Sequence, residues 1–230
     1  MSQHRSSTSR PHLSAPAGQA ARRRTRPPAD LITPMQLAEL QAVVSRTGDD
    51  PQLDQQIVRM ILTAGARPQD VLDLTLGDLD EDECTARLSD KFGLTAYQPL
   101  PDWFVTTLLE FARSRGAEQP EDAVFRYQPD GRRGGAPISR RRFDYVFDRV
   151  RDHLPSGNDA QISSYALRRH AITAIERHSN RAVAAAFGRI RLDYTGRHAA
   201  VRPVDVAAAV VAVSGGDHPW LHRSPRPHTD

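Results

Sequence analysis

The stretch of sequence that decides the fold lies at residues 162–173 and has the sequence ISSYALRRHAIT. Serine is a preferred helix N-cap, so Ser163 and Ser164 predict a helix that begins here and runs to about His178. Arg168 and Arg169 place two guanidinium groups on that helix. The sequence therefore predicts a basic helix within the last third of the chain.

Most of the chain around this stretch is also predicted to be helical. Residues 53–64 place apolar side chains at helical spacing and stop at Gly65. Two short runs on either side of residues 90–93 predict a β-hairpin. The expected fold class is α+β, mostly α-helical, with a small antiparallel sheet. The other expected elements are helices over residues 33–44, 103–112, 139–153, 181–187 and 204–213, hairpin strands over 85–88 and 96–100, and a short strand over 123–125.

Composition divides the chain into three regions. Residues 1–30 contain mainly Ser, Ala, Pro and Arg without a hydrophobic period, and such a segment cannot bury enough surface to offset its ordering entropy. We expect a disordered basic arm over 1–30, a folded domain over 31–213 and a flexible C-terminal tail over 214–230. His218 and His222 in the tail have the spacing of one helix face, but Pro219 lies between them and no third ligand is evident, so no metal site is expected.

The composition also excludes several classes of protein. The single cysteine, Cys84, excludes an intrachain disulfide framework. The longest apolar run covers residues 206–213, far fewer than the roughly 20 residues that a membrane helix needs. No N-terminal segment has the apolar core of a signal peptide. We therefore expect a soluble protein with no membrane partner, in a reducing compartment such as the bacterial cytoplasm.

Charge is distributed unevenly over a chain whose formal net charge is +3. Residues 1–30 carry +5, residues 31–130 carry −10 and residues 131–230 carry +8. A basic half beside a basic tail is typical of a protein that binds a polyanion, although an arginine-rich solvated surface gives the same count. Lys91 is the one lysine among the 31 basic residues, and lysine, unlike arginine, can release a proton.

Three segments of the sequence form a pattern. They are LTAGARPQDV at 62–71, SDKFG at 89–93, and the stretch at 162–173 followed by Phe187-Gly188-Arg189. In this order and spacing they resemble the catalytic domain of the tyrosine recombinase, or phage integrase, family. The resemblance spans residues 31–213 and implies a DNA-binding protein that takes part in site-specific recombination or integration.

The resemblance implies a specific chemistry. In the family a tyrosine attacks a backbone phosphate to give a 3′-phosphotyrosyl intermediate, and a 5′-hydroxyl later reverses the step. Negative charge develops on the phosphate oxygens and is matched by the bidentate donors of two arginines, whose positions Arg67 and Arg168 occupy. Lys91 stands at the position of the hairpin lysine that protonates the leaving oxygen. Double-stranded DNA is the expected partner, and the scheme needs neither metal nor other cofactor.

Several positions depart from the family pattern. Tyr165 stands where the family has its first histidine, and Arg189 stands where it has a second histidine and can still donate to a phosphate. His198 stands where the family has the nucleophilic tyrosine. Three possibilities follow: a protein that does not cleave, attack by Tyr194 from one helical turn earlier, or attack by His198 itself.

The sequence leaves competing functions open. Family members usually carry an N-terminal helical domain that closes a clamp around DNA, whereas here only the basic arm precedes the expected domain, so a second copy or another recombinase is an expected partner on DNA. The main hypotheses are a strand-transfer enzyme of the recombinase type and a non-cleaving accessory or regulatory DNA-binding protein on the same fold. A helix-turn-helix transcription factor over residues 167–190 and a protein-interaction module are further alternatives.

Overall fold

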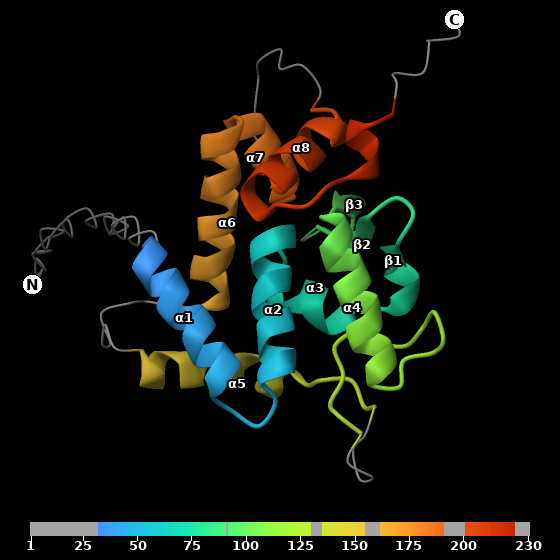
Figure 1. Ribbon diagram of the computed structural model, residues 1–230. Helices are drawn as coiled ribbons and strands as arrows, with labels where there is room; N and C mark the ends of the chain where they lie inside the picture. The colour runs from blue at the N-terminus through green and yellow to red at the C-terminus, as the bar shows by residue number, and fades with distance from the viewer. Residues whose placement is uncertain (1–31, 91, 130–134, 155–161, 191–200, 224–230) are drawn as a thin grey trace, which may run out of the picture.

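The computed structural model describes residues 32–90, 92–129, 135–154, 162–190 and 201–223. Helices dominate these ranges, and a small antiparallel sheet with strand order β1-β2-β3 lies beside them (Figure 1). Within the same ranges, no helix is long and apolar enough to cross a membrane. The elements are α1 (Pro34–Arg46), α2 (Pro51–Ala64), α3 (Pro68–Asp73), β1 (Leu79–Asp80), β2 (Thr85–Ser89), β3 (Thr95–Pro99), α4 (Asp102–Ser114), α5 (Arg140–His153), α6 (Ser164–His178), α7 (Arg181–Phe187), α8 (Pro203–Ser214) and two 3-10 helices, Leu76–Asp78 and Pro219–Leu221.

Helix α2 runs through the middle of the fold, between the sheet and helices α1 and α6 (Figure 1). Both α1 and α6 pack against it. Most buried apolar side chains form one core around α2, and Leu167 of α6 belongs to it. A second, smaller core lies between α6, α7 and α8 and includes Ala171, Phe187 and Val210. Because α6 contributes to both cores, it fixes the C-terminal helices relative to α2.

The predicted fold class is confirmed, and local signals explain why. Thr33 and Gln36 form a reciprocal capping box at the start of α1, so two backbone N–H groups that the helix leaves unpaired find acceptors. Asp50 caps α2 by accepting a hydrogen bond from the Leu53 N–H at 3.1 Å. The expected hairpin is also present, with β2 and β3 paired in antiparallel register.

Gly65 ends α2 in the left-handed conformation, with φ +56°. Its α carbon lies against the ring of Phe187, where an added Cβ would be 2.8 Å from a ring carbon. Both the backbone angle and the close packing therefore require glycine here. The sharp turn frees the Gly65 carbonyl to act as an acceptor for side chains outside the helix.

The structure differs from the prediction in one expected strand and in one strand that the sequence does not predict. The expected strand over 123–125 makes a single bridge, between Ala123 and Thr75, because Thr75 lies between α3 and a 3-10 helix and offers no longer extended neighbour. The additional strand β1 pairs Leu79 with Ala86 and Asp80 with Thr85. It is too short for an alternating pattern to reveal it.

Residues 215–223, the first part of the segment expected to be a flexible tail, make defined contacts in the structure. His218 is fully buried, with its Nε2 atom 3.2 Å from the Cys84 carbonyl, and its Nδ1 atom accepts a hydrogen bond from the Trp220 N–H. Glu83 accepts hydrogen bonds from the indole of Trp220 at 2.7 Å and from both Nη groups of Arg223. We call residues 215–223 the C-terminal strap.

We expect acidification to weaken the C-terminal strap. Burial lowers the pKa of His218 below its ordinary 6.5, so as the pH falls below 6.5 the unfolded chain gains a proton that the folded chain resists. Protonated Nδ1 would also lose its bond from Trp220. The free energy of unfolding should therefore fall between about pH 6.5 and 5, by at most about 1.4 kcal/mol per pH unit for this one group.

The measurement is urea unfolding at pH 7 and at about pH 5.5. Glu83 and Asp217, which face His218, stay ionised in this window because hydrogen bonds hold the pKa of each carboxyl below its usual value. His218→Gln serves as the control and should lose less stability over the same interval. An equal loss in both proteins would assign the pH dependence to other groups.

Candidate functional site

Three arginine side chains from separate parts of the chain meet beside the C-terminal end of α2. Arg67 is the N-cap residue of α3, Arg168 lies on α6, and Arg189 follows α7. Their hydrogen bonds share two acceptors, the Gly65 carbonyl and the Asp70 carboxylate. We call the three side chains the arginine cluster. The fold thus brings the two arginines predicted as phosphate ligands to one place.

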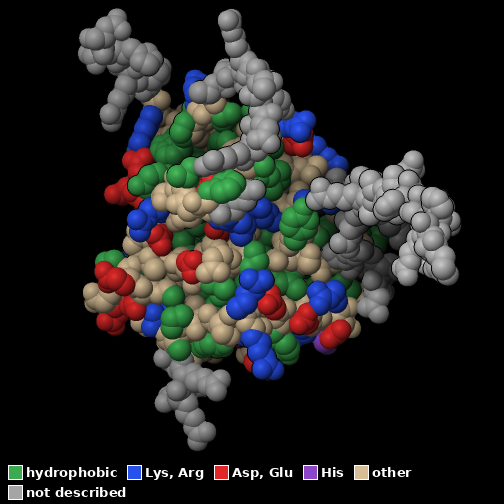
Figure 2. Space-filling view, turned by 180° about the vertical axis from the view of Figure 1, so that it is seen from behind, with side chains coloured by type: hydrophobic (Ala, Val, Ile, Leu, Met, Phe, Trp, Pro, Cys, Tyr) green, Lys and Arg blue, Asp and Glu red, His purple; other side chains and the backbone are tan. Residues whose placement is uncertain are grey.

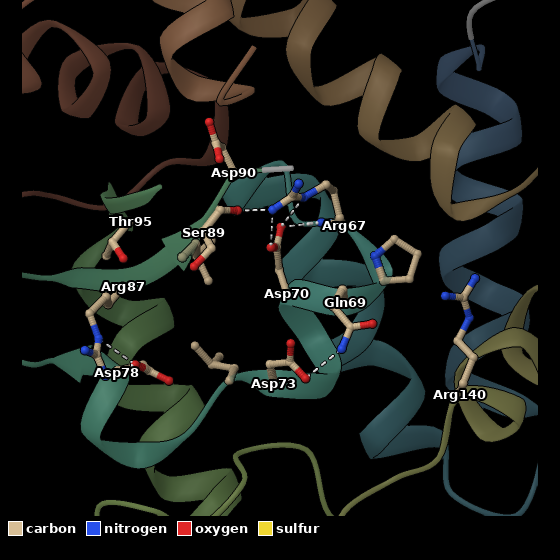
Figure 3. Close-up of a pocket in the computed structure, with 13 residues that line it drawn as sticks. Arg67, Gln69, Asp70, Asp73, Asp78, Arg87, Ser89, Asp90, Thr95 and Arg140 are labelled. Atoms are coloured by element: carbon tan, nitrogen blue, oxygen red, sulfur yellow. Dashed lines mark hydrogen bonds and ion pairs between the residues drawn. The ribbon is translucent and has the colours of Figure 1, made fainter. Parts of the chain in front are cut away.

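Arg67 is held by Asp70, one turn further along. The Arg67 N–H donates to Asp70 Oδ2 at 2.7 Å, and its Nη2 group donates to Asp70 Oδ1 at 3.0 Å. The Nη2 group also donates to the Ser89 carbonyl at the end of β2, so the cluster adjoins the hairpin (Figure 3). The side chain is 24% exposed, and within the described chain its Nη1 group has no hydrogen-bond partner. Arg67 therefore keeps a donor for an outside acceptor.

Arg168 is anchored by backbone carbonyls. Its Nε group donates to the Gly65 carbonyl at 2.7 Å, and its Nη2 group donates to the Gly188 carbonyl. Burial lowers the pKa of Arg168 to about 10, and the positive charges of Arg189 and Arg67 add to the shift. The guanidinium still carries its full charge at neutral pH, and its Nη1 group has no hydrogen-bond partner in the part of the chain that the structure describes.

Arg189 lies deeper, with its side chain 3% exposed. Its Nη1 group donates to the Ala64 carbonyl at 3.1 Å and to Gln98 Oε1 at 2.9 Å. Its Nη2 group donates to the Gly65 carbonyl at 3.2 Å and to Asp70 Oδ2 at 2.5 Å. Burial lowers the pKa of Arg189 from its ordinary value, and the Asp70 carboxylate opposes this shift.

Gln98 is a site residue that the sequence did not reveal. It lies on β3, is 2% exposed and contacts the guanidinium of Arg189. The one available signal is a polar residue within the predicted hairpin strand over 96–100, and that signal does not specify a partner.

The arginine cluster carries an excess of positive charge. Asp70 hydrogen-bonds to two of its members, and Asp90 is near enough to raise the pKa of Arg189. Among the residues that the structure describes, two carboxylates thus face three guanidinium groups, which leaves one positive charge in a partly buried place. A phosphodiester carries one negative charge, and arginine binds phosphate oxygens through paired, charge-assisted hydrogen bonds. The arrangement suits a backbone phosphate.

No protein-family model and no curated protein sequence matches the chain. Solved structures do match. The integrase from mycobacterium phage Brujita gives a TM-score of 0.55 at 15% identity, covering 86% of this chain and 61% of that one. The Tn1549 transposon integrase in complex with a circular intermediate DNA gives 0.57 at 14% identity, covering 71% and 59%. XerA recombinase gives 0.51 at 12% identity, covering 69% and 55%. The chain has the tyrosine recombinase catalytic-domain fold.

The tyrosine recombinase fold confirms the structural half of the sequence resemblance. This chain spans less than two thirds of the length of each of those three chains. Tyr165, at the first histidine position of the family, is 68% exposed on the first turn of α6, one turn before Arg168. Lys91, Tyr194 and His198 lie outside the described residues, so their roles as general acid and nucleophiles stay predictions.

A pocket of about 510 Å³ adjoins the arginine cluster. Arg67, Ser89 and Asp90 lie along one edge of it, and Asp73 and Asp78 lie along the opposite edge (Figure 3). Four aspartates and three arginines line it, so its own charge disfavours an anion. The arginine cluster, in contrast, gathers three guanidinium groups around one carboxylate, so its charge favours an anion more than that of the pocket does. The lining residues are Arg67, Pro68, Gln69, Asp70, Asp73, Leu74, Asp78, Arg87, Leu88, Ser89, Asp90, Thr95 and Arg140.

Proposed function

We propose that this protein binds double-stranded DNA in site-specific recombination, by holding a backbone phosphate in the arginine cluster. The observation that carries the proposal is the meeting of Arg67, Arg168 and Arg189 around Gly65 and Asp70 with an unbalanced positive charge. Arg67 and Arg168 each keep an Nη1 group without a partner in the described chain, so these two contact the phosphate.

The proposal rests on the local arginine cluster and not on a broad basic face. On the side of the molecule drawn in Figure 2, acidic and basic side chains are intermixed rather than gathered by sign. That face therefore offers no broad basic patch, and the proposal rests on the guanidinium groups that the fold gathers in the arginine cluster. Proteins of the same fold have been solved on DNA, namely Tn1549 integrase with transposon right end DNA and a lambda integrase tetramer on a Holliday junction. By analogy with these structures, we infer that this chain binds duplex DNA and that other copies of the chain are its partners on the DNA.

DNA binding predicts a specific response to arginine substitution. Arg67→Ala and Arg168→Ala should each weaken binding to a mixed-sequence duplex roughly 10- to 100-fold, because each removes a charge-assisted phosphate contact. Each should also reduce the slope of log affinity against log salt concentration by about 0.9. Fluorescence anisotropy at a series of salt concentrations measures both quantities.

Arg113→Ala is the matched control, because Arg113 is an exposed arginine in the last turn of α4. It should bind as the wild type does. Circular dichroism and thermal unfolding of all variants check that the fold persists. Absent or salt-independent binding by the wild type would refute the proposal.

Two outcomes are distinguished by one further assay. The non-cleaving alternative is favoured by the sequence, in which His198 stands at the nucleophile position. A duplex selected for binding, carrying a nick beside each candidate phosphate, traps a covalent protein–DNA adduct if strand transfer starts. An adduct lost in Tyr194→Phe or His198→Phe identifies the nucleophile, and binding without an adduct identifies an accessory or regulatory DNA-binding protein.

A further inference from the structure

Arg189 has no hydrogen on its Nη groups left for a phosphate. The four Nη hydrogens have four acceptors inside the protein: the Ala64 carbonyl, the Gly65 carbonyl, the Asp70 carboxylate and Gln98 Oε1. The Nε group is buried and has no hydrogen-bond partner among the described residues. A side chain that is 3% exposed and whose Nη groups are both fully engaged acts on the protein rather than on DNA.

The acceptors of Arg189 are also the supports of the other two arginines. The Asp70 carboxylate binds both Arg67 and Arg189, and the Gly65 carbonyl accepts from both Arg168 and Arg189. Removing the Arg189 guanidinium would therefore take one hydrogen-bond donor from the Asp70 carboxylate and one from the Gly65 carbonyl. Its location thus couples the placement of Arg67 to the placement of Arg168.

The backbone delivers Arg189 to this position. Its φ is +49°, in the left-handed region that non-glycine residues rarely adopt. Its N–H donates to the Ala186 carbonyl and the Ile190 N–H donates to the Ala185 carbonyl, both at 2.9 Å, so the turn that ends α7 fixes the residue. Such strain persists where the surrounding contacts determine it, and here those contacts are the four acceptors.

Gln98 accepts from Arg189 without adding negative charge. Its Oε1 atom faces the guanidinium, while its Nε2 atom is buried and has no hydrogen-bond partner within the described ranges. A buried unpaired amide N–H is unfavourable, so the orientation of the amide is dictated by Arg189. A glutamate in the same place would form an ion pair and cancel the excess positive charge of the cluster.

We propose that Arg189 is a positioning residue and Gln98 its neutral partner, which together hold the Gly65 carbonyl and Asp70 so that Arg67 and Arg168 present their free donors to a phosphate. The inference rests on the proposed function for the identity of the ligand. It departs from the family pattern, in which a histidine stands at the position of Arg189.

The first test replaces the neutral partner by a charged one of the same shape. Gln98→Glu should keep or raise the thermal stability, because the carboxylate pairs with a buried guanidinium. It should weaken binding to the mixed-sequence duplex about tenfold or more, because the cluster loses its net charge. A purely structural role for Gln98 would move stability and affinity in the same direction. Gln98→Glu binding as tightly as the wild type would overturn the proposal.

The second test reads the positioning without DNA. In Arg189→Met, hydrogen exchange of the Arg168 Nε–H, followed by NMR, should be at least about tenfold faster than in the wild type, because the Gly65 carbonyl is no longer held. Core backbone amides, such as that of Ile57 in α2, provide the control and should stay protected. Unchanged exchange at Arg168 would refute the positioning role.

The two proposals fail in different ways. A wild type that binds no DNA refutes the proposed function, while the exchange measurement still decides whether Arg189 positions Arg168. If Arg67→Ala binds DNA more weakly than the wild type but Arg189→Met binds as tightly as the wild type, the proposed function is supported and this inference is refuted. An Arg189→Met variant whose salt slope falls by about 0.9, as in Arg67→Ala, would make Arg189 a direct phosphate ligand instead.

Discussion

Replacing Asp70 with alanine will lower the free energy of unfolding by about 3–5 kcal/mol, because it leaves a buried guanidinium without its counter-ion. The Asp70 side chain is 4% exposed and the Arg189 side chain 3% exposed, and their closest atoms are 2.5 Å apart. The same carboxylate also accepts from the Arg67 N–H, so the substitution removes the cap of α3 as well. Urea unfolding measures the difference.

Inorganic phosphate should restore part of this loss. A phosphate that occupies the place of the missing carboxylate binds the folded state alone, and stability then rises with phosphate concentration. Asp73→Ala is the control on the same helix, because Asp73 is exposed and accepts from the Gln69 side chain at 2.7 Å. It should change stability by less than about 0.5 kcal/mol. If Asp70→Ala unfolds no more easily than Asp73→Ala, the carboxylate does not hold the cluster together.

Helix boundaries could be predicted from the sequence because the groups that determine them are local. Thr33 finds its capping partner three residues later, and Ser163 accepts from the Ala166 N–H within the first turn of α6. Gly65 ends α2 by its own backbone conformation. Each signal lies within a few residues, so periodicity and capping rules reach it. The prediction of a strand over 123–125 is wrong because pairing there depends on Thr75, which is distant in the sequence.

The site could be predicted only in part, for the same physical reason. Arg67 and Arg168 were identified through resemblance to a family, and their meeting at Gly65 depends on how α6 packs against α2. No spacing rule connects them. Gln98 and the inward turn of Arg189 are products of tertiary contact, which local pattern cannot reach. Features that depend on interactions within a few residues could therefore be predicted from the sequence, and features that depend on tertiary contacts could not.

Asp54, near the other end of α2, also has partners that local sequence patterns do not reveal. Its replacement by alanine will lower the free energy of unfolding by about 3–5 kcal/mol. The side chain is fully buried and pairs with two arginines of α5, with Arg142 Nη2 at 2.5 Å and with Arg149. Arg149 also donates to Thr47 Oγ1 at 3.0 Å and lies against Gly48, where an added Cβ would be 2.1 Å from its Nη1 atom. Without Asp54, two largely buried cations would repel each other with no carboxylate between them.

Two comparisons separate charge pairing from packing at Asp54. Asp54→Asn keeps the shape but not the charge, so it should lose most of the stability that Asp54→Ala loses. Replacing Asp54, Arg142 and Arg149 together by leucine and two methionines should restore much of it, because an apolar cluster needs no counter-ion. A triple variant as unstable as Asp54→Ala would show that packing around Gly48, not the buried charge, sets the cost. Since Asp54 lies about 15 Å along α2 from the arginine cluster, folded Asp54→Asn should bind DNA with wild-type affinity.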